Sequence, residues 1–215
     1  MTLILGARCT DGVVIVGDTK ITSTIGTVLR YEPKLAGVLR NVIFGYAGSV
    51  IMYKVFERYI IGDLMILRDS SDKYTADNLV NKIAEAMCVI KEARSNQYFD
   101  LRVMIGRQFP RDGKSDLHVV NSQGRINHIS NWKAIGKGES SANPIVERRW
   151  TEDTSMKEFA LLSYCIIRCA EQERPEESVG GEPKIRYQKD GADLDTEPSE
   201  DEIKEFQESI NFFKA

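Results

Sequence analysis

The chain has 215 residues, a length that suits one medium-sized domain with a substantial core. Its formal net charge of −3 at pH 7 gives no basic footprint for nucleic acid, and Arg58 and Asp63 interrupt the longest apolar stretches, which argues against a membrane span. Four cysteines without paired spacing and a start unlike a secretory signal favour a reducing, cytoplasmic setting over a disulfide-stapled fold.

The first fifty residues are typical of strands joined by turns. A strand from Thr2 to Arg8 meets a hairpin turn at Asp11-Gly12, and the return strand Val13–Asp18 ends in a carboxylate. Further along, we expect strands at Leu35–Leu39, directly after Lys34, and at Val42–Tyr46, with a turn at Asn41 between them.

Two helices are expected next, followed by strands. Residues 49–67 are rich in apolar side chains, which predicts a helix buried on more than one side. A second helix begins near Thr75 and carries apolar residues at helical spacing: Leu79, Val80, Ile83, Ala84, Met87 and Ile90. Strands are then expected at Leu101–Ile105 and Leu117–Val120, a turn at Gln123-Gly124, and a short strand pair ending at Ile135.

The last third of the chain contains two capping-box patterns. Ser155 and Glu158 open an apolar helix that runs through Ala170. Residues 171–202 are polar, apart from a candidate strand at Lys184–Tyr187. A second capping box at residues 199–202 opens a final helix whose apolar stripe comprises Ile203, Phe206, Ile210 and Phe213. Such a stripe can pack on its own domain, the commoner case, or on a neighbouring subunit.

The second residue carries the most specific chemistry. If Met1 is removed, Thr2 supplies both a hydroxyl nucleophile and a free α-amine that can act as its base. An amine with a pKa of about 7.7–8.0 is partly neutral near pH 7, and a nearby ammonium lowers that value further.

Four separated features of the N-terminal fifty residues agree with one family in type and in spacing. They are Thr2, the segment Asp18-Thr19-Lys20-Ile21-Thr22, Lys34, and Ala47-Gly48-Ser49-Val50. The chain resembles the proteasome β-type threonine proteases, including the HslV-type enzymes, which are N-terminal-nucleophile (Ntn) hydrolases. The resemblance implies an α+β fold, a four-layer αββα sandwich over residues 1–190, with residues 191–215 forming an acidic loop and a C-terminal amphipathic helix.

The resemblance also implies roles for these residues. Lys34 would polarise the hydroxyl and lower the pKa of the amine, Asp18 would hold Lys34 charged, and the Gly48 N–H would stabilise the oxyanion. The backbone of Thr22 would pair with an extended peptide, so that the substrate adds a strand. The implied reaction is acyl transfer, with an acyl-enzyme formed on Thr2 and then hydrolysed.

Two family positions differ in this chain. The family's Gly-Ser-Gly matches Gly136-Lys137-Gly138, where an ammonium replaces the hydroxyl. Its Asp, which precedes a Ser-Gly by three residues, matches Glu177 with Gly180-Gly181, where the acid is one methylene longer and the serine is absent. Both changes alter groups that position the proton relay.

The resemblance places the substrate's first-residue pocket at five positions: Ile21, Glu32, Ala36, Tyr46 and Val50. Tyr46 would limit the depth of the pocket, and Glu32 would favour a basic substrate residue. The alternative is that Glu32 faces solvent while Tyr46 belongs to the core.

Three functions follow from these observations. The first is a threonine peptidase subunit of a self-compartmentalising, homo-oligomeric ring that degrades peptides or unfolded proteins, with related subunits or an ATPase as partners. The second is a non-catalytic ring subunit, and the third a stand-alone Ntn amidase or peptide ligase. We expect no cofactor and no metal, since Cys165 and Cys169 lack further ligands and are better explained by packing.

Overall fold

The computed structural model describes residues 2–22, 28–39, 41–69, 75–93, 100–108, 113–173, 179–192 and 194–213. The strands are β1 (Leu3–Cys9), β2 (Gly12–Gly17), β3 (Lys20–Thr22), β4 (Val28–Tyr31), β5 (Leu35–Leu39), β6 (Val42–Gly48), β7 (Leu101–Gln108), β8 (Ser115–Val120), β9 (Ile126–Ile129), β10 (Trp132–Gly136) and β11 (Lys184–Lys189). The helices are α1 (Val50–Asp69), α2 (Thr75–Ala93), α3 (Glu139–Arg149), α4 (Met156–Glu173) and α5 (Glu200–Phe213).

The predicted N-terminal hairpin forms, but its turn lies one residue earlier than the predicted Asp11-Gly12. β1 and β2 pair antiparallel, and their register closes at Cys9 opposite Gly12, so the turn residues are Thr10 and Asp11. Every residue of β2 is buried, as expected for a strand that is covered on both faces.

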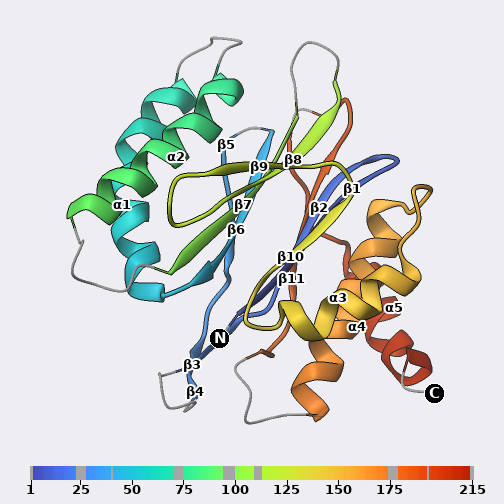
Figure 1. Cartoon of the computed structure of the whole chain (residues 1–215). Coiled ribbons are helices and arrows are strands. Elements are labelled where there is room, and N and C mark those ends of the chain that lie inside the picture. The colour runs from blue at the N-terminus through green and yellow to red at the C-terminus, as the bar shows by residue number, and fades with distance from the viewer. Residues whose placement is uncertain are drawn as a thin grey trace.

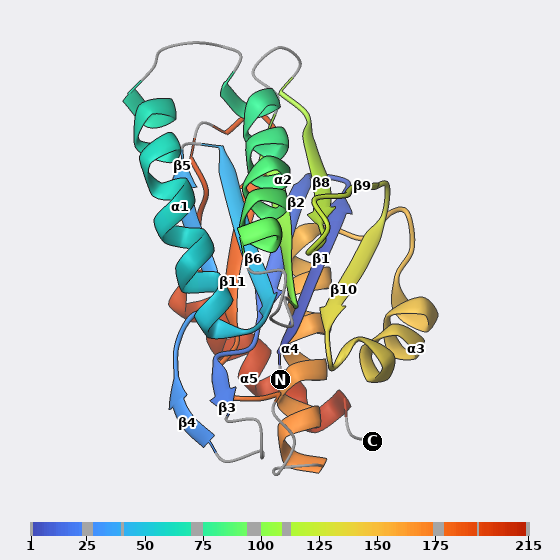
Figure 2. The same cartoon turned by 60° about the vertical axis from the view of Figure 1, so that its left-hand side comes forward.

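Two antiparallel sheets pack against each other. One has the strand order β10-β1-β2-β11 and the other β5-β6-β7-β8-β9. The core between them is made of apolar side chains from both sheets: Ile4, Val13, Ile15, Leu35, Ile43, Ala47, Met104, Leu117, Val119 and Ile135. A separate two-stranded ribbon, β3–β4, extends from the end of the molecule at which the N-terminus lies (Figure 2).

Helices cover the outer face of each sheet. α1 and α2 pack on the five-stranded sheet, while α3 and α4 pack on the four-stranded sheet, so the helix pairs lie on opposite sides (Figure 1). This arrangement confirms the four-layer αββα sandwich expected from the sequence.

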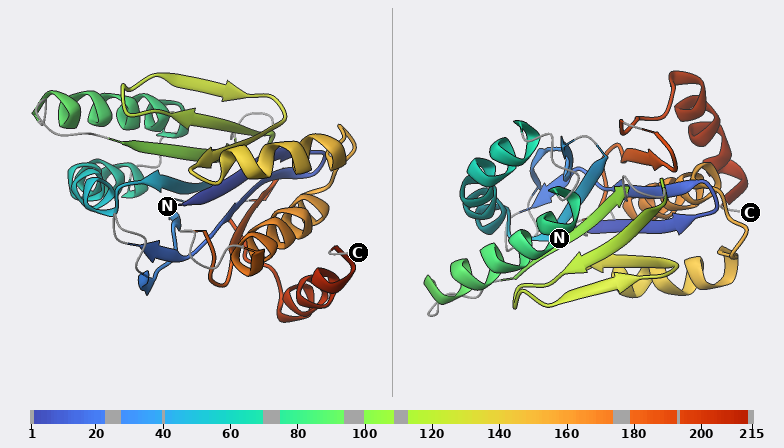
Figure 3. Two further views of the ribbon diagram at one scale, coloured as in Figure 1. Left: turned by 60° about the horizontal axis from the view of Figure 1, so that its bottom comes forward. Right: turned by 90° about the horizontal axis from the view of Figure 1, so that it is seen from above.

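The final helix packs on its own chain. The Phe206 side chain of α5 is fully buried, and its ring lies 5.8 Å from that of Tyr164 in α4. Both predicted capping boxes form: the Ser155 N–H donates to Glu158 (2.8 Å), and the Ser199 N–H donates to Glu202 (3.0 Å). Figure 3 shows α5 outside α4, away from the sheets. The domain boundary near residue 190 stays a prediction.

Two predictions about elements were wrong, and one helix was not predicted. The strands β9 and β10 do not pair with each other, since β9 lies at the edge of the five-stranded sheet and β10 at the edge of the other. Helix α3 was not predicted; Pro144 lies inside it and only Ala142 and Val146 are buried, so its apolar pattern is weak. Over residues 50–60, α1 buries one face, because Ile51 and Tyr59 on the other side are exposed.

Within the described part of the chain, no helix is both long enough and apolar enough to cross a membrane.

Candidate functional site

Thr2 lies where β1 begins, against the turn that follows β10. Only 5% of Thr2 is exposed. Its carbonyl oxygen accepts a hydrogen bond from the Gly138 N–H (3.4 Å), and a Cβ added at Gly136 would lie 2.0 Å from the same oxygen. Gly136 has φ +109°. A side chain at Gly136 would therefore push Thr2 out of its place.

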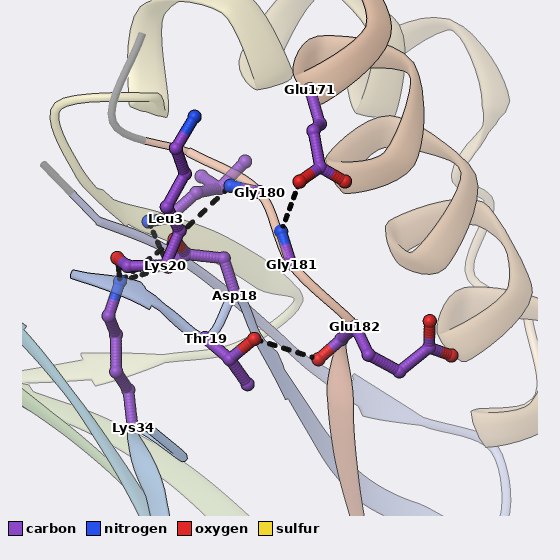
Figure 4. Close-up of polar contacts among 9 residues, drawn as sticks. All are labelled: Leu3, Asp18, Thr19, Lys20, Lys34, Glu171, Gly180, Gly181 and Glu182. Carbon is purple, nitrogen blue, oxygen red and sulfur yellow. Dashed lines mark hydrogen bonds and ion pairs between the residues drawn. The ribbon is translucent and has the colours of Figure 1, made fainter. Parts of the chain in front are cut away.

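A buried ion pair lies beside this strand end. Lys34 Nζ is 2.7 and 2.8 Å from the two carboxylate oxygens of Asp18, and neither side chain is more than 1% exposed. The N–H of Leu3, the residue after Thr2, donates to Asp18 Oδ1 (2.9 Å). Asp18 therefore links the lysine directly to the first strand residue (Figure 4).

Burial and pairing act in opposite directions on this ion pair. Burial raises the pKa of Asp18 and lowers the pKa of Lys34, while the contact between the two groups opposes both shifts. The Lys20 carbonyl oxygen also lies 2.7 Å from Lys34 Nζ, so three oxygens surround the nitrogen. Three acceptors match the three N–H donors of an ammonium, which favours the charged form.

Gly48 ends β6 in a backbone conformation that suits glycine. Its φ is +131°, and an added Cβ would lie 2.1 Å from the Asp100 carbonyl oxygen. A Cβ added at Gly136 would lie 3.4 Å from the Cβ of Ala47, so the turn beside Thr2 adjoins the end of β6. The structure thus brings Thr2, Asp18, Lys34 and Gly48 to one end of the two sheets.

Of the two positions that differ from the family pattern, the structure describes only one. Lys137 is exposed on the turn between β10 and α3. Glu177 lies outside the described residues. Of the glycines near it, Gly180 donates its N–H to Asp18 Oδ2 (3.4 Å), and its carbonyl oxygen accepts from the N–H groups of Thr19 (3.1 Å) and Lys20 (2.9 Å).

The six residues expected to contact the substrate do not share one environment. Ile21 is buried and Thr22 is half-buried, at an irregularity in the pairing of β3 with β4. Tyr46 is buried and its ring stacks on Tyr53 with centroids 3.5 Å apart, which places it in the core beneath α1.

The other three residues expected to contact the substrate, Ala36, Val50 and Glu32, are half-buried, and Ala36 packs against the core beneath α1. Val50 is the first residue of α1. Glu32 forms an ion pair with Arg30 (2.8 Å), which partly neutralises the charge that a basic substrate would meet.

A cavity of about 500 Å³ adjoins the site. Its lining includes Thr19, Tyr31, Glu32, Arg168, Glu171 and Gly181. Thr19 and Gly181 directly follow Asp18 and Gly180, so the cavity shares a wall with the segments that hold the ion pair.

Two residues near the site have contacts that the sequence did not predict. Lys20, whose carbonyl oxygen binds Lys34, is itself 2% exposed, although lysine is normally a surface residue. Glu171 of α4 accepts the Gly181 N–H (2.8 Å). Neither contact has a local sequence signal, because each depends on where distant segments meet. Among the described residues, no three His, Cys, Asp or Glu side chains cluster closely enough to hold a metal ion.

The family described as proteasome subunit matches residues 2–179. The chain belongs to the proteasome subunit family. This confirms the family and the Ntn-hydrolase type of fold that the N-terminal residues indicated.

Two curated relatives of this proteasome-family chain are named alpha subunits. It is 22% identical over 210 residues to "Proteasome subunit alpha" of Methanobrevibacter smithii, covering 97% of this chain and 81% of that protein. It is 26% identical over 187 residues to "Proteasome subunit alpha" of Methanococcus vannielii, covering 81% and 67%.

Among solved structures, Anbu (ancestral beta-subunit) from Yersinia bercovieri superposes with a TM-score of 0.77 at 14% identity, covering 99% of this chain and 93% of that one. An Anbu (Gly-1) mutant from Hyphomicrobium sp. strain MC1 gives 0.77 at 17% identity, covering 100% and 94%. These likenesses show the fold.

Proposed function

We propose that this chain is a threonine-type peptidase subunit of a self-compartmentalising ring, and that the hydroxyl of Thr2 acts as its nucleophile once Met1 is removed. Asp18, Lys34 and Gly48 are the remaining catalytic groups. Lys137 and Glu177 occupy the positions of the family residues that adjust the proton relay.

One observation carries this proposal: a buried lysine–aspartate pair is bound to the backbone next to Thr2. Stability alone is a weak reason for such a pair, because replacing a buried ion pair with apolar residues of similar volume often leaves the stability of a protein unchanged or raises it. Burial shifts the pKa values of Asp18 and Lys34 from their usual ranges, and the pair lies at a strand end that also contains a candidate nucleophile, which supports a catalytic use.

The proposed reaction is a two-stage acyl transfer. The Thr2 α-amine takes the hydroxyl proton while Oγ attacks the substrate carbonyl carbon, and the Gly48 N–H donates to the oxyanion. The amine then gives that proton to the leaving nitrogen as the C–N bond breaks, which leaves an ester on Thr2. A water molecule deprotonated by the same amine hydrolyses the ester and restores Thr2.

Lys34 would act on the base rather than on the substrate. Its ammonium lowers the pKa of the α-amine by like-charge repulsion, so a larger fraction of the amine is neutral at pH 7. Asp18 would keep Lys34 in place during both stages.

Membership of the proteasome subunit family supports assembly into a ring, with copies of this chain or related subunits as neighbours. Peptides or unfolded proteins would be the substrates, and an unfolding ATPase would be a further partner.

A non-catalytic ring subunit is the second candidate. It is favoured by the names of the curated relatives, which are alpha subunits, and by Lys137, which replaces a serine hydroxyl next to the amine. In this case the ion pair would be structural.

Cleavage of fluorogenic peptides separates these two candidates. Peptides with Arg, Leu or Asp before the scissile bond should be cut by the wild type. Thr2→Ala should abolish cleavage and Thr2→Ser should retain part of it, because serine keeps both hydroxyl and amine. Cleavage that persists in Thr2→Ala would rule out the proposed nucleophile. Absence of cleavage and of reaction with a threonine-directed epoxyketone in the assembled wild type would favour the non-catalytic subunit.

A further inference from the structure

The segment Gly180-Gly181 is fixed to the ion pair from several sides. Gly180 donates to Asp18, and its carbonyl oxygen accepts from the backbone of Thr19 and Lys20. Lys34 in turn binds both Asp18 and the Lys20 carbonyl oxygen. A shift of the two glycines would therefore move the groups that hold Lys34.

One side chain from another layer holds this segment. Glu171, near the C-terminal end of α4, accepts the Gly181 N–H through Oε1 (2.8 Å) and pairs with Arg168 through Oε2 (2.8 Å). A Cβ added at Gly180 would lie within 2.9 Å of the Glu171 carboxyl group. The carboxylate therefore packs on Gly180 while it binds Gly181 (Figure 4).

The helix itself does not favour an acid at this position. Glu171 lies in the last turn of α4, where the negative end of the helix dipole disfavours a carboxylate. Arg168 and the Gly181 N–H offset this cost. The carboxylate also lines the 500 Å³ cavity, so it is half-buried rather than part of the core.

We propose that Glu171 is a positioning residue that, through Gly181 and Gly180, keeps Asp18 and Lys34 aligned for the reaction of Thr2. This inference rests on the proposed function of the site. Nothing in the residue pattern marks Glu171, because its role depends on the length of its side chain and on where α4 ends.

The length of this side chain provides the test. Glu171→Asp keeps the charge but is one methylene too short to keep the Gly181 contact at its present length, whereas Glu171→Gln keeps an oxygen that can accept the N–H. We expect Glu171→Asp to slow modification of Thr2 by a peptide epoxyketone roughly ten- to a hundredfold, as a small misplacement of reacting groups does. We expect it also to shift the pH of half-maximal rate, and Glu171→Gln to restore most of the rate.

Glu173→Asp is the matched control, since it makes the same change at an exposed acid two residues further along α4. It should react as the wild type does. A Glu171→Asp rate and pH profile equal to those of the control would overturn the proposal, as would a Glu171→Gln rate no better than that of Glu171→Asp.

A second readout does not require activity. In NMR spectra of the assembled protein, Glu171→Asp should speed hydrogen exchange at the Gly181 amide and shift the titration of the Asp18 carboxyl carbon, and Glu173→Asp should do neither. A wild type that does not react with the epoxyketone would overturn the proposed function. Unchanged hydrogen exchange at Gly181 and unchanged titration of Asp18 in Glu171→Asp would separately overturn the positioning role.

Discussion

A buried charge is tolerated only where acceptors surround it, and Lys34 meets that condition with three oxygens. Because Asp18 is equally buried, removing either partner leaves the other charge without compensation in a dry environment. Variants that remove one or both charges can therefore distinguish the contribution of the pair to stability from its proposed contribution to catalysis.

Lys34→Met should lower the free energy of unfolding by about 3–5 kcal/mol, the usual effect of breaking a buried ion pair from one side. The double variant Asp18→Asn/Lys34→Met should recover much of that loss, since neither charge remains, yet its Thr2 should stay unreactive. Urea denaturation measures the first effect and epoxyketone modification the second. A double variant that is modified at the wild-type rate would show that the lysine has no part in catalysis.

Among the elements, β7 and β8 are joined by a second buried ion pair, far from Thr2 in the sequence. Arg107 Nε donates to Asp116 Oδ1 (2.9 Å), and His118 Nε2 lies 2.7 Å from Asp116 Oδ2. Burial alone would raise the pKa of Asp116, but the hydrogen bonds from His118 and Arg107 hold it below its usual value. The Asp116 carboxylate on β8 therefore stays ionised to a lower pH than an ordinary aspartate does.

The stability of this strand pair should depend on pH. The pKa of Asp116 is lower in the folded chain than in the unfolded one, where it is about 3.9, so its contribution is complete above that pH and is lost as the pH falls through the folded value. Asp116→Asn should lower the free energy of unfolding by about 3 kcal/mol at pH 7. The difference from wild type should shrink when urea unfolding is repeated at pH 3. An unchanged difference at pH 3 would contradict the ionised pair.

For the molecule as a whole, local sequence patterns predicted most helices and strands, but they did not predict the contacts between segments that are distant in the sequence. The β1–β2 hairpin, α2 and both capping boxes have signals within a few residues of each other. The assignment of β9 and β10 to different sheets has no such signal, because sheet membership depends on pairing with distant strands. Asp18 and Lys34 were predicted through the spacing of a known family, whereas Glu171 and the burial of Lys20 depend on the packing of α4 and β3 beside them.

The layered packing also determines which cysteines can react. Burial raises the pKa of Cys9 to about 12 and that of Cys165 to about 11, and both residues belong to the core cluster that α4 forms with β1 and β2. Cys88 and Cys169 are half-buried.

In the folded protein at pH 8, iodoacetamide should therefore modify Cys88 and Cys169 well before Cys9 and Cys165, and in urea all four should react. Peptide mapping by mass spectrometry gives the order of labelling. Rapid labelling of Cys9 in the folded protein would show that this core is open to solvent.

The measurement that tests the central claim most directly is the intact mass of the assembled protein before and after treatment with a peptide epoxyketone, with Thr2→Ala alongside. We predict a wild-type mass that lacks Met1 and increases by one inhibitor, with the adduct mapped to the Thr2 residue, and no increase for Thr2→Ala. Retention of Met1 on the wild type, or an equal adduct on both proteins, would contradict the assignment of Thr2 as the nucleophile.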